Sequence, residues 1–156
     1  MVEVTVAGYK TLSLSHLVLD YNGTLACDGQ LLEGIAERLN ALASELQIHV
    51  VTADTFGTVR QQLAEIPCDV VVLPLENQDT AKRNLVGHLD ADATVAVGNG
   101  RNDRLMLKAA ALGIAVVQEE GAAVETVIAA DIVCPDMFSA LDLLDNPKRL
   151  IATLRS

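Results

Sequence analysis

Residues 17–24 read Leu-Val-Leu-Asp-Tyr-Asn-Gly-Thr, a short apolar run that ends at an acidic residue and a glycine-containing turn. Similar apolar runs, rich in β-branched residues, recur along the chain at residues 48–51, 70–73, 94–97, 114–117 and 132–134. Continuous runs of this kind are typical of strands that are buried on both faces of a parallel sheet. The sequence therefore predicts a parallel β-sheet.

Helical spacing fills the segments between these runs. Apolar side chains step by three and four over residues 32–46, and shorter patterns cover residues 85–89 and 105–112. Gly113 is the predicted end of the helix at 105–112, and residues 140–155 are predicted to form two short helices. Strands that alternate with helices imply right-handed crossovers. The predicted fold class is thus α/β, a three-layer α/β/α sandwich with a parallel, Rossmann-like sheet.

The N-terminal segment differs from the rest of the chain. Residues 2–6 and 11–15 alternate between apolar and polar side chains, and residues 7–10 are suited to a turn, so a β-hairpin is predicted. No linker, internal repeat or low-complexity tract interrupts the sequence. Residues 1–156 are therefore expected to form a single domain, without an insertion long enough for a second one.

The composition limits the classes of partner. The chain has 156 residues, of which 51% are hydrophobic and only 3% aromatic, and its 21 acidic and 11 basic residues give a net charge of -10. Proteins that bind the nucleic-acid backbone carry a basic surface, and single strands are bound on aromatic side chains. We therefore expect no nucleic-acid partner and favour a small-molecule one.

The sequence also predicts a cytoplasmic protein without a membrane partner. The first ten residues lack the pattern of a signal peptide, and no apolar run approaches the roughly 20 residues of a membrane span. The cysteines Cys27, Cys68 and Cys134 are odd in number and widely spaced. This arrangement favours neither a disulfide framework nor a zinc site.

Polar residues follow the predicted strands at the edge where ligands bind in sheets of this kind. Asp20 could be a nucleophile, a metal ligand or a simple cap, and the Thr52 hydroxyl could bind a phosphate oxygen or cap a helix. Lys82 lies near the start of a helix, where its charge opposes the helix dipole, so a bound phosphate or a solvated surface position would explain it. Residues 98–103, Gly-Asn-Gly-Arg-Asn-Asp, form a glycine-containing loop whose last residue could hold a divalent cation.

Taken in order, these features resemble the haloacid dehalogenase (HAD) superfamily of phosphotransferases. Its four motifs match residues 17–24, residues 48–52, Lys82 and residues 98–103, and the resemblance runs over residues 17–133. Four parts in the right order and context are far more specific than any one of them. The form of the last motif is similar to the phosphorylation domain of P-type ATPases, and the chain looks like the small, soluble P-type ATPase-like hydrolases.

The resemblance implies a two-step phosphoryl transfer through an aspartyl-phosphate on Asp20. It implies catalytic roles for Asp20, Asn22, Thr52 and Lys82. The implied phosphate-binding residues are Asp20, Gly23, Thr24, Thr52, Ala53 and Lys82. The implied cofactor is Mg²⁺, held by the Asp20 carboxylate, the Asn22 backbone carbonyl, Asn99 and Asp103.

Two positions depart from the phosphatase pattern. Asn22 stands where that branch has an acid that protonates the leaving group, and loss of such a group lowers rates by roughly a hundred- to ten-thousand-fold. Asn99 stands where an acid normally contacts the metal, so weaker Mg²⁺ binding is expected. A slow phosphatase or ATPase-like hydrolase is the first reading. The alternative is a non-catalytic phosphate-binding or regulatory protein on the same fold.

The expected substrate is a small phosphorylated molecule, and the site is expected to lack a cap domain. Residues 24–48 hold one predicted helix, and residues 52–82 hold one helix and one strand, which leaves no room for a cap. Capless members of the superfamily act on large substrates or let a neighbouring subunit close the site. We therefore expect a homo-oligomer, in which the hairpin at 2–15 is a candidate contact.

Overall fold

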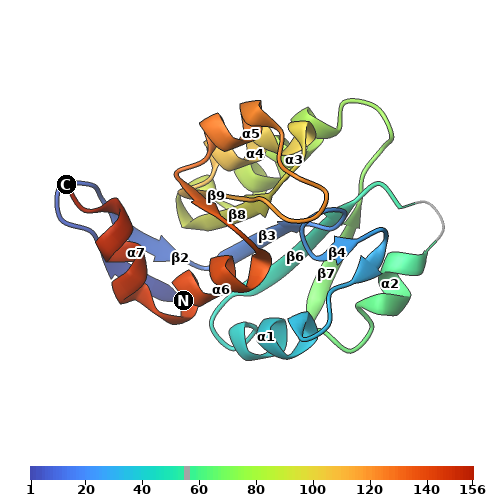
Figure 1. Ribbon diagram of the computed structural model, residues 1–156, viewed down its shortest axis with the longest axis horizontal. Coiled ribbons are helices and arrows are strands. Elements are labelled where there is room, and N and C mark those ends of the chain that lie inside the picture. Colours follow the sequence, from blue (N-terminus) through green and yellow to red (C-terminus); the bar gives the residue numbers. More distant parts are fainter. Residues whose placement is uncertain (55–56) are drawn as a thin grey trace.

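The computed structural model describes residues 1–54 and 57–156. Its centre is a six-stranded parallel sheet in the order β10-β9-β8-β3-β6-β7 (Figure 1). The strands are β3 (His16–Asp20), β6 (Gln47–Thr52), β7 (Cys68–Val72), β8 (Thr94–Gly98), β9 (Leu112–Val116) and β10 (Ile132–Cys134). From β3 the chain builds outward through β6 and β7 on one side, and later through β8, β9 and β10 on the other. The order therefore reverses between β3 and β8, which is where ligands bind in open α/β sheets.

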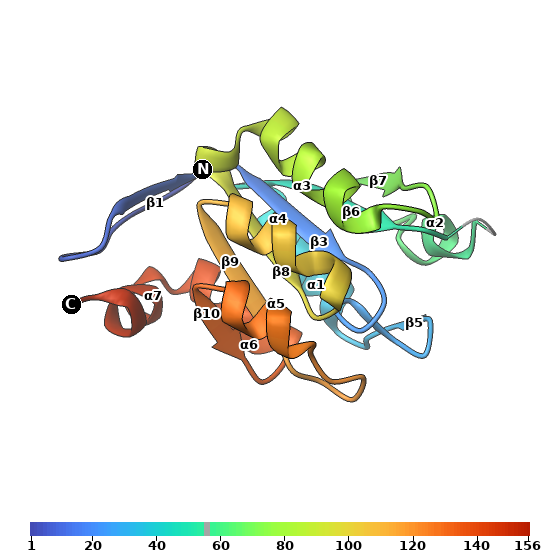
Figure 2. The same ribbon diagram turned by 90° about the horizontal axis from the view of Figure 1, so that it is seen from above.

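Helices cover both faces of the sheet, as Figures 1 and 2 show. One face carries α3 (Gln78–Leu89), α4 (Arg104–Ala109) and α5 (Val124–Ala129), and the other carries α1 (Ile35–Leu42) and α6 (Met137–Asp145). Strand β3 alternates between two apolar clusters, since Val18 belongs to one and Leu17 and Leu19 to the other. Both faces of β3 are thus shielded from water, as its uninterrupted apolar sequence predicts.

The remaining elements are short. Helix α2 (Thr58–Gln62) precedes β7, and the 3₁₀ turns η1 (Ala91–Ala93) and η2 (Arg101–Asp103) flank β8. Helix α7 (Pro147–Leu154) follows α6 after a break at Asn146, and its proline is accommodated in the first turn, where a backbone amide would lack a partner. Strands β4 (Ala26–Cys27) and β5 (Gln30–Leu31) form a small antiparallel pair after β3.

The predicted N-terminal hairpin is confirmed as β1 (Val2–Thr5) paired with β2 (Thr11–Leu14). Val4, Leu12 and Leu14 are buried, and α7 contacts β1. The tip of the hairpin is bound to the body of the same chain, because Tyr9 donates its hydroxyl to Asp131 over 2.9 Å and Lys10 donates to the Ala111 carbonyl. This hairpin is thus anchored within its own chain.

The predicted α/β/α sandwich with a parallel sheet is confirmed, but one boundary is wrong. Gly113 does not end a helix: α4 ends at Ala109, and Gly113 lies inside β9. A Cβ at Gly113 would lie 2.3 Å from the Leu107 carbonyl oxygen, so glycine is required for the strand to pass against the end of the helix. The first helix is also shorter than predicted, from Ile35 to Leu42. Among the described residues, no helix is long and apolar enough to cross a membrane.

Candidate active site at the carboxyl edge of the sheet

Strand register brings the polar strand ends to one edge. Asp20 pairs with Val51 on β6, so Thr52 lies one step further along the same edge, and Leu19 pairs with Val97 on the other side. Gly98 and the loop that follows therefore lie beside the end of β3. The tertiary structure thus places Asp20, Thr52 and the 98–103 loop on adjacent strands at the point where the strand order reverses.

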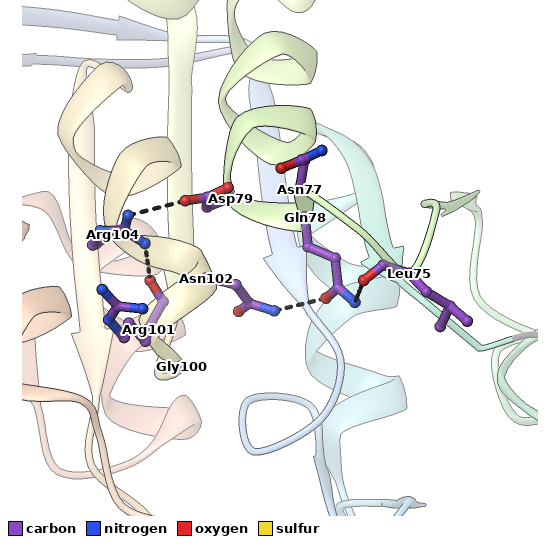
Figure 3. Close-up of a pocket in the computed structure, with 8 residues that line it drawn as sticks. All are labelled: Leu75, Asn77, Gln78, Asp79, Gly100, Arg101, Asn102 and Arg104. Carbon is purple, nitrogen blue, oxygen red and sulfur yellow. Dashed lines mark hydrogen bonds and ion pairs between the residues drawn. The ribbon is translucent and has the colours of Figure 1, made fainter.

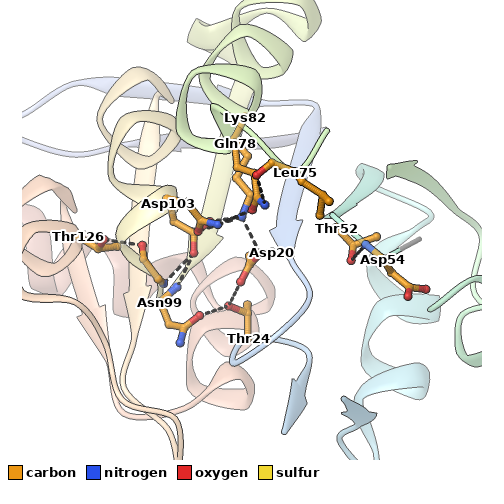
Figure 4. A network of polar contacts seen from close by, with 12 residues as sticks. Asp20, Thr24, Thr52, Asp54, Leu75, Gln78, Lys82, Asn99, Asp103 and Thr126 are labelled. Carbon is orange, nitrogen blue, oxygen red and sulfur yellow. Dashed lines mark hydrogen bonds and ion pairs between the residues drawn. The ribbon is translucent and has the colours of Figure 1, made fainter. Parts of the chain in front are cut away.

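A buried lysine joins two carboxylates at this edge (Figure 4). Lys82 Nζ lies 2.7 Å from Asp20 Oδ1 and 2.6 Å from Asp103 Oδ1, and these three side chains come from α3, β3 and η2. Lys82 is 2% exposed, Asp20 8% and Asp103 fully buried. Helix α3 runs back along the sheet from its start at Gln78, which carries Lys82 over the end of β3.

This cluster carries more negative than positive charge, since two carboxylates face one ammonium group. Burial, together with the neighbouring charge of Asp103, raises the pKa of Asp20 to about 7 even though Lys82 opposes the shift. Burial by itself would lower the pKa of Lys82, but the two carboxylates outweigh it and the pKa is raised. The site thus contains a lysine that stays charged and a carboxyl group whose ionisation is unfavourable without a further cation.

Asp103 organises the loop that follows β8. Its Oδ2 accepts hydrogen bonds from the backbone amides of Asn99 and Gly100, at 2.9 and 2.8 Å, while its Oδ1 accepts from Lys82. A Cβ at Gly98 would lie 2.5 Å from the Asp103 carboxylate, so only glycine permits this approach. Both carboxylate oxygens of Asp103 are therefore engaged within the protein.

Thr24 and Asn99 complete the cluster on the side of Asp20 that faces away from Lys82. The Thr24 hydroxyl is fully buried and lies 3.4 Å from both Asp20 Oδ2 and Asn99 Oδ1. Gly23 has a φ of +76°, and a Cβ there would lie 2.3 Å from Asn99 Nδ2. The loop after β3 therefore packs against the loop after β8 only because residue 23 is glycine.

The backbone amides of the first loop are used inside it. Gly23 donates to the Ala26 carbonyl at 2.9 Å, and the amides of Thr24, Leu25 and Ala26 all donate to the Tyr21 carbonyl, at 3.0 to 3.2 Å. The resemblance to the HAD superfamily implies that Gly23 and Thr24 bind phosphate. In the structure the amides of Gly23 and Thr24 already donate to carbonyls inside the loop. A phosphate group would have to compete with those carbonyls for the two N–H groups.

Three predicted site residues lie beside this cluster and have no hydrogen bond to it. The Thr52 hydroxyl is buried and accepts from the Asp54 amide at 3.1 Å, which leaves its own proton available for donation. Asn22 and Ala53 line a cavity of about 440 Å³ with Asp54 and Leu75. Asn22 is exposed, and Asp54 accepts from the Val59 amide at 3.0 Å.

A second cavity, of about 580 Å³, shares Leu75 with the first (Figure 3). Its wall contains Asn102, which accepts from Lys82 at 3.3 Å and donates to Gln78 at 2.8 Å. Arg104 also lines it and donates to Asp79 at 2.9 Å. Asp20 lines neither of these two cavities, so the location of the site rests on the cluster and not on cavity size.

Gln118, which connects three segments of the site, was not among the residues predicted from the sequence. Gln118 donates from Nε2 to the carbonyls of Gly23 and Thr24, at 3.0 and 2.9 Å, and its Oε1 accepts from the Met137 amide at 2.9 Å. It is the first polar residue after the apolar run at 114–117. The rule that identified Asp20 and Thr52 would therefore have identified Gln118 too.

The donor set of the site fits Mg²⁺ only in part. Oxygen donors are present in the Asp20 carboxylate and the Asn99 side-chain carbonyl, and the excess negative charge would be offset by a cation. Over residues 1–54 and 57–156, however, no group of three acidic, histidine or cysteine side chains is arranged to hold a metal ion. Such a site would rely on an amide oxygen, a backbone carbonyl and the substrate's own phosphate.

Comparison with known proteins begins with two short sequence matches. No protein-family model matches the chain. Uncharacterized protein MJ0073 of Methanocaldococcus jannaschii is 54% identical over 61 residues, which cover 39% of this chain and 66% of that protein. Uncharacterized protein MJ0072 of the same organism is 46% identical over 39 residues, which cover 25% of this chain and 89% of that protein. The chain therefore belongs to the family of MJ0072, and it spans slightly less than two thirds of MJ0073.

Solved structures match nearly the whole chain at low identity. The 3-deoxy-D-manno-octulosonate 8-phosphate phosphatase of Moraxella catarrhalis, in complex with magnesium ion, phosphate ion and KDO, has a TM-score of 0.72 at 17% identity and covers 92% of this chain and 94% of its own. The cobalt-bound phosphatase of the same description from Haemophilus influenzae has a TM-score of 0.73 at 16% identity, with coverage of 92% and 94%. A hydrolase of the HAD superfamily from Legionella pneumophila scores 0.73 at 17%, covering 91% and 87%. The chain thus has the fold of HAD-superfamily phosphatases.

Proposed function

We propose that this protein is a Mg²⁺-dependent phosphoryl hydrolase that acts on small phosphorylated substrates and uses Asp20 as its nucleophile. The observation that supports this most strongly is the buried bridge from Lys82 to Asp20 and Asp103. A buried ion pair is weak as a device for stability, because desolvation offsets much of the attraction. Its position at the carboxyl ends of the strands, in the fold of HAD phosphatases, favours a catalytic purpose.

In the proposed first step, a carboxylate oxygen of Asp20 attacks phosphorus as the bond to the leaving oxygen breaks, which gives an aspartyl-phosphate and the free alcohol or alkoxide. Lys82 supplies positive charge for the phosphoryl oxygens, and the Thr52 hydroxyl can donate its proton to one of them. Water then attacks the aspartyl-phosphate, so that phosphate leaves and the Asp20 carboxylate is regenerated. Asp20 must be ionised to react. Because its pKa is raised to about 7, a cation bound nearby would increase the fraction of Asp20 that is ionised.

Mg²⁺ would be held by the Asp20 carboxylate, the Asn99 side-chain oxygen and the Asn22 backbone carbonyl. When bound, it would neutralise negative charge on the phosphoryl group. Asp103 would not bind the cation directly, because its oxygens already bind Lys82 and the loop amides; it would instead hold these groups in place. An organising role for Asp103 agrees better with these contacts than direct ligation does.

Asn22 lines a cavity together with Ala53 and Asp54, and this cavity is where we place the leaving group. An amide cannot protonate that group, so good leaving groups such as aryl phosphates should react much faster than alkyl phosphates. Phosphoanhydrides such as ATP, whose leaving group is also good, remain candidate substrates of an ATPase-like activity. Closure of this open edge by a second copy of the chain remains part of the proposal.

A non-catalytic phosphate-binding role is the second candidate. It is favoured by Asn22 and Asn99, the two amides at positions where an acid would assist catalysis. Such a protein would use Lys82 and Thr52 to bind phosphate without turnover. It would retain binding but release no product.

The test is phosphate release from p-nitrophenyl phosphate and from ATP, with Mg²⁺ and with EDTA. Wild type should turn over only with Mg²⁺, and Asp20→Asn should reduce the rate to background. Asp92→Asn makes the same chemical change on η1, next to the start of β8 at the opposite edge of the sheet, and should leave the rate unchanged. Turnover that persists in Asp20→Asn would exclude the proposed nucleophile. No turnover in wild type, combined with phosphate binding that Lys82→Met abolishes, would favour the second candidate.

A further inference from the structure

The side chain of Gln118 makes hydrogen bonds to three backbone groups and uses both of its N–H donors to do so. Its amide nitrogen donates to the carbonyls of Gly23 and Thr24, and its oxygen accepts from Met137 at the start of α6. These groups lie 19 to 95 residues away in sequence. The side chain reaches from the end of β9, past the end of β8, to the loop that follows β3.

Gln118 binds two carbonyls of the loop after β3, and the hydrogen bonds that close this loop do not involve Gln118. The turn from Tyr21 to Ala26 is already closed by its own amides, which donate to carbonyls inside the loop. The peptide groups that carry the Gly23 and Thr24 carbonyls are held by these bonds at their N–H ends, which are the amides of Thr24 and Leu25. The tilt of each group also depends on what holds its carbonyl end. Gln118 binds both carbonyl oxygens from outside and thereby sets that tilt.

The tilt matters because of what Thr24 contacts. Its hydroxyl lies 3.4 Å from Asp20 Oδ2 and 3.4 Å from Asn99 Oδ1, two oxygens proposed to hold the cation. The proposed third donor, the Asn22 carbonyl, belongs to the peptide group just before Gly23. Rotation of the peptide groups of Gly23 and Thr24 would move the Thr24 hydroxyl and the Asn22 carbonyl together.

The segment that follows Gln118, residues 119–126, also binds the loop after β8. The Gly121 carbonyl accepts from Asn99 Nδ2 at 2.9 Å, and the Ala123 amide donates to the Asn99 carbonyl at 2.8 Å. The Thr126 hydroxyl donates to the Gly100 carbonyl at 2.6 Å. Residues 118–126 therefore connect the loop after β3 to the loop after β8, and Gln118 is their contact with the first of these.

We propose that Gln118 is a positioning residue that aligns the oxygens of the loop after β3 with Asn99 for cation binding. The proposal rests on the proposed function, since it assigns Gln118 to the same site. Residues that orient metal ligands from outside typically contribute about 10- to 100-fold in metal affinity or activity. Gln118 touches neither Asp20 nor Lys82, so its effect should appear in Mg²⁺ binding before it appears in the chemical step.

Three variants test this. Gln118→Met keeps the shape of the side chain and removes its hydrogen bonds. Gln118→Glu keeps the shape but puts a carboxylate oxygen in the place of the amide nitrogen, where it faces the carbonyls of Gly23 and Thr24. It should therefore be worse than Gln118→Met. Gln62→Met is the control for the loss of a bridging glutamine. Gln62 binds the backbone of Gly29 and Leu31 and accepts from the Tyr21 hydroxyl, but it makes no hydrogen bond to the carbonyl of Gly23 or Thr24.

The measurements are Mg²⁺ binding by calorimetry, Mg²⁺ dependence of p-nitrophenyl phosphate turnover, and amide hydrogen exchange of residues 20–26 without metal. We expect Gln118→Met to raise the Mg²⁺ dissociation constant about 10- to 100-fold and to speed exchange in that segment, with a smaller change in kcat at saturating Mg²⁺. Gln62→Met should leave the dissociation constant within about twofold of the wild-type value.

The outcomes separate the two proposals. If wild type binds Mg²⁺ without turnover and Gln118→Met weakens that binding, the hydrolase proposal fails and the positioning role stands. If wild type turns over and Gln118→Met leaves Mg²⁺ binding and segment exchange unchanged, the positioning role is wrong and the hydrolase stands. If Gln62→Met weakens Mg²⁺ binding as much as Gln118→Met, the effect is general loss of stability and the positioning role is also wrong. If wild type neither binds Mg²⁺ nor turns over, both fail.

Discussion

Asn99 donates its side-chain amide to the Gly121 carbonyl over 2.9 Å, and this bond turns Asn99 Oδ1 toward Thr24 and Asp20. An aspartate at this position would present an oxygen to the Gly121 carbonyl instead of a donor. The amide is therefore required by the surrounding structure, and it still presents an oxygen to the proposed cation site.

Asn99→Asp should consequently destabilise the metal-free protein by about 1–3 kcal/mol, since it leaves the partly buried Gly121 carbonyl facing a carboxylate. The substitution adds a third carboxylate to the site, beside Asp20 and Asp103. Addition of Mg²⁺ should therefore raise the Tm of the variant more than it raises the Tm of wild type. Thermal unfolding in EDTA and in Mg²⁺ measures both effects. Asn40 also donates to a backbone carbonyl but is exposed, so Asn40→Asp should change stability by less than about 0.5 kcal/mol. Equal effects of the two substitutions would contradict the assignment.

Gly23→Ala should destabilise the protein more than Gly29→Ala does. Both glycines have positive φ, at +76° and +79°, so each alanine brings a backbone strain of roughly 1–2 kcal/mol. Only Gly23 has a close neighbour, because its added Cβ would lie 2.3 Å from Asn99, whereas nothing lies within 4 Å at Gly29. Crowding of this kind adds about 1–3 kcal/mol. Denaturant unfolding of both variants gives the difference, and a difference near zero would show that the two loops do not pack as described.

The stability of the metal-free protein should depend on pH through Asp20. The pKa of Asp20 is about 7 in the folded protein against an ordinary value of 3.8, so the unfolded chain releases this proton first as pH rises. The contribution of Asp20 to stability is therefore complete below about pH 4 and is lost as pH rises toward 7. In EDTA, Asp20→Asn should gain stability relative to wild type between these values. Parallel pH profiles of the two proteins would refute the raised pKa, and Asp92→Asn should run parallel to wild type.

A second pH effect of opposite sign should arise at the other edge of the sheet. Burial and the neighbouring His16 lower the pKa of His49, although Asp69 opposes this, and the two imidazole rings are joined by a hydrogen bond of 3.3 Å. The unfolded chain then binds the proton at higher pH than the folded protein. The stability contribution of neutral His49 is present above about pH 6.5 and is lost as pH falls through that value.

His49→Gln should therefore reduce the loss of stability between pH 7.5 and 5, which chemical denaturation at several pH values can measure. His88 is exposed, so His88→Gln serves as the control and should keep the wild-type slope. An unchanged slope in His49→Gln would show that the two histidines do not carry this effect.

Strand positions and the parallel sheet were predictable from the sequence because burial on both faces leaves a direct signal in the side chains. The run at residues 17–19 has no polar residue since both of its faces are covered. The run at 48–51 keeps its apolar character for the same reason, apart from His49. The end of α4 was not predictable from the sequence. A glycine can end a helix or can let a strand pass close to a helix, as Gly113 does, and the local sequence does not distinguish these two roles.

Local sequence also indicated which residues would reach the edge of the sheet, because a strand's last residue and its following turn adjoin each other in the chain. Contacts between residues far apart in the chain could not be predicted in this way. The bridge from Lys82 to Asp20 and Asp103 spans 62 and 21 residues, and the contact of Gln118 with Thr24 spans 94. Such contacts arise from strand order and helix packing, which bring distant segments together. The raised pKa of Asp20, the engaged oxygens of Asp103 and the orientation of the Asn99 amide all follow from these long-range contacts, and therefore belong to the folded chain alone.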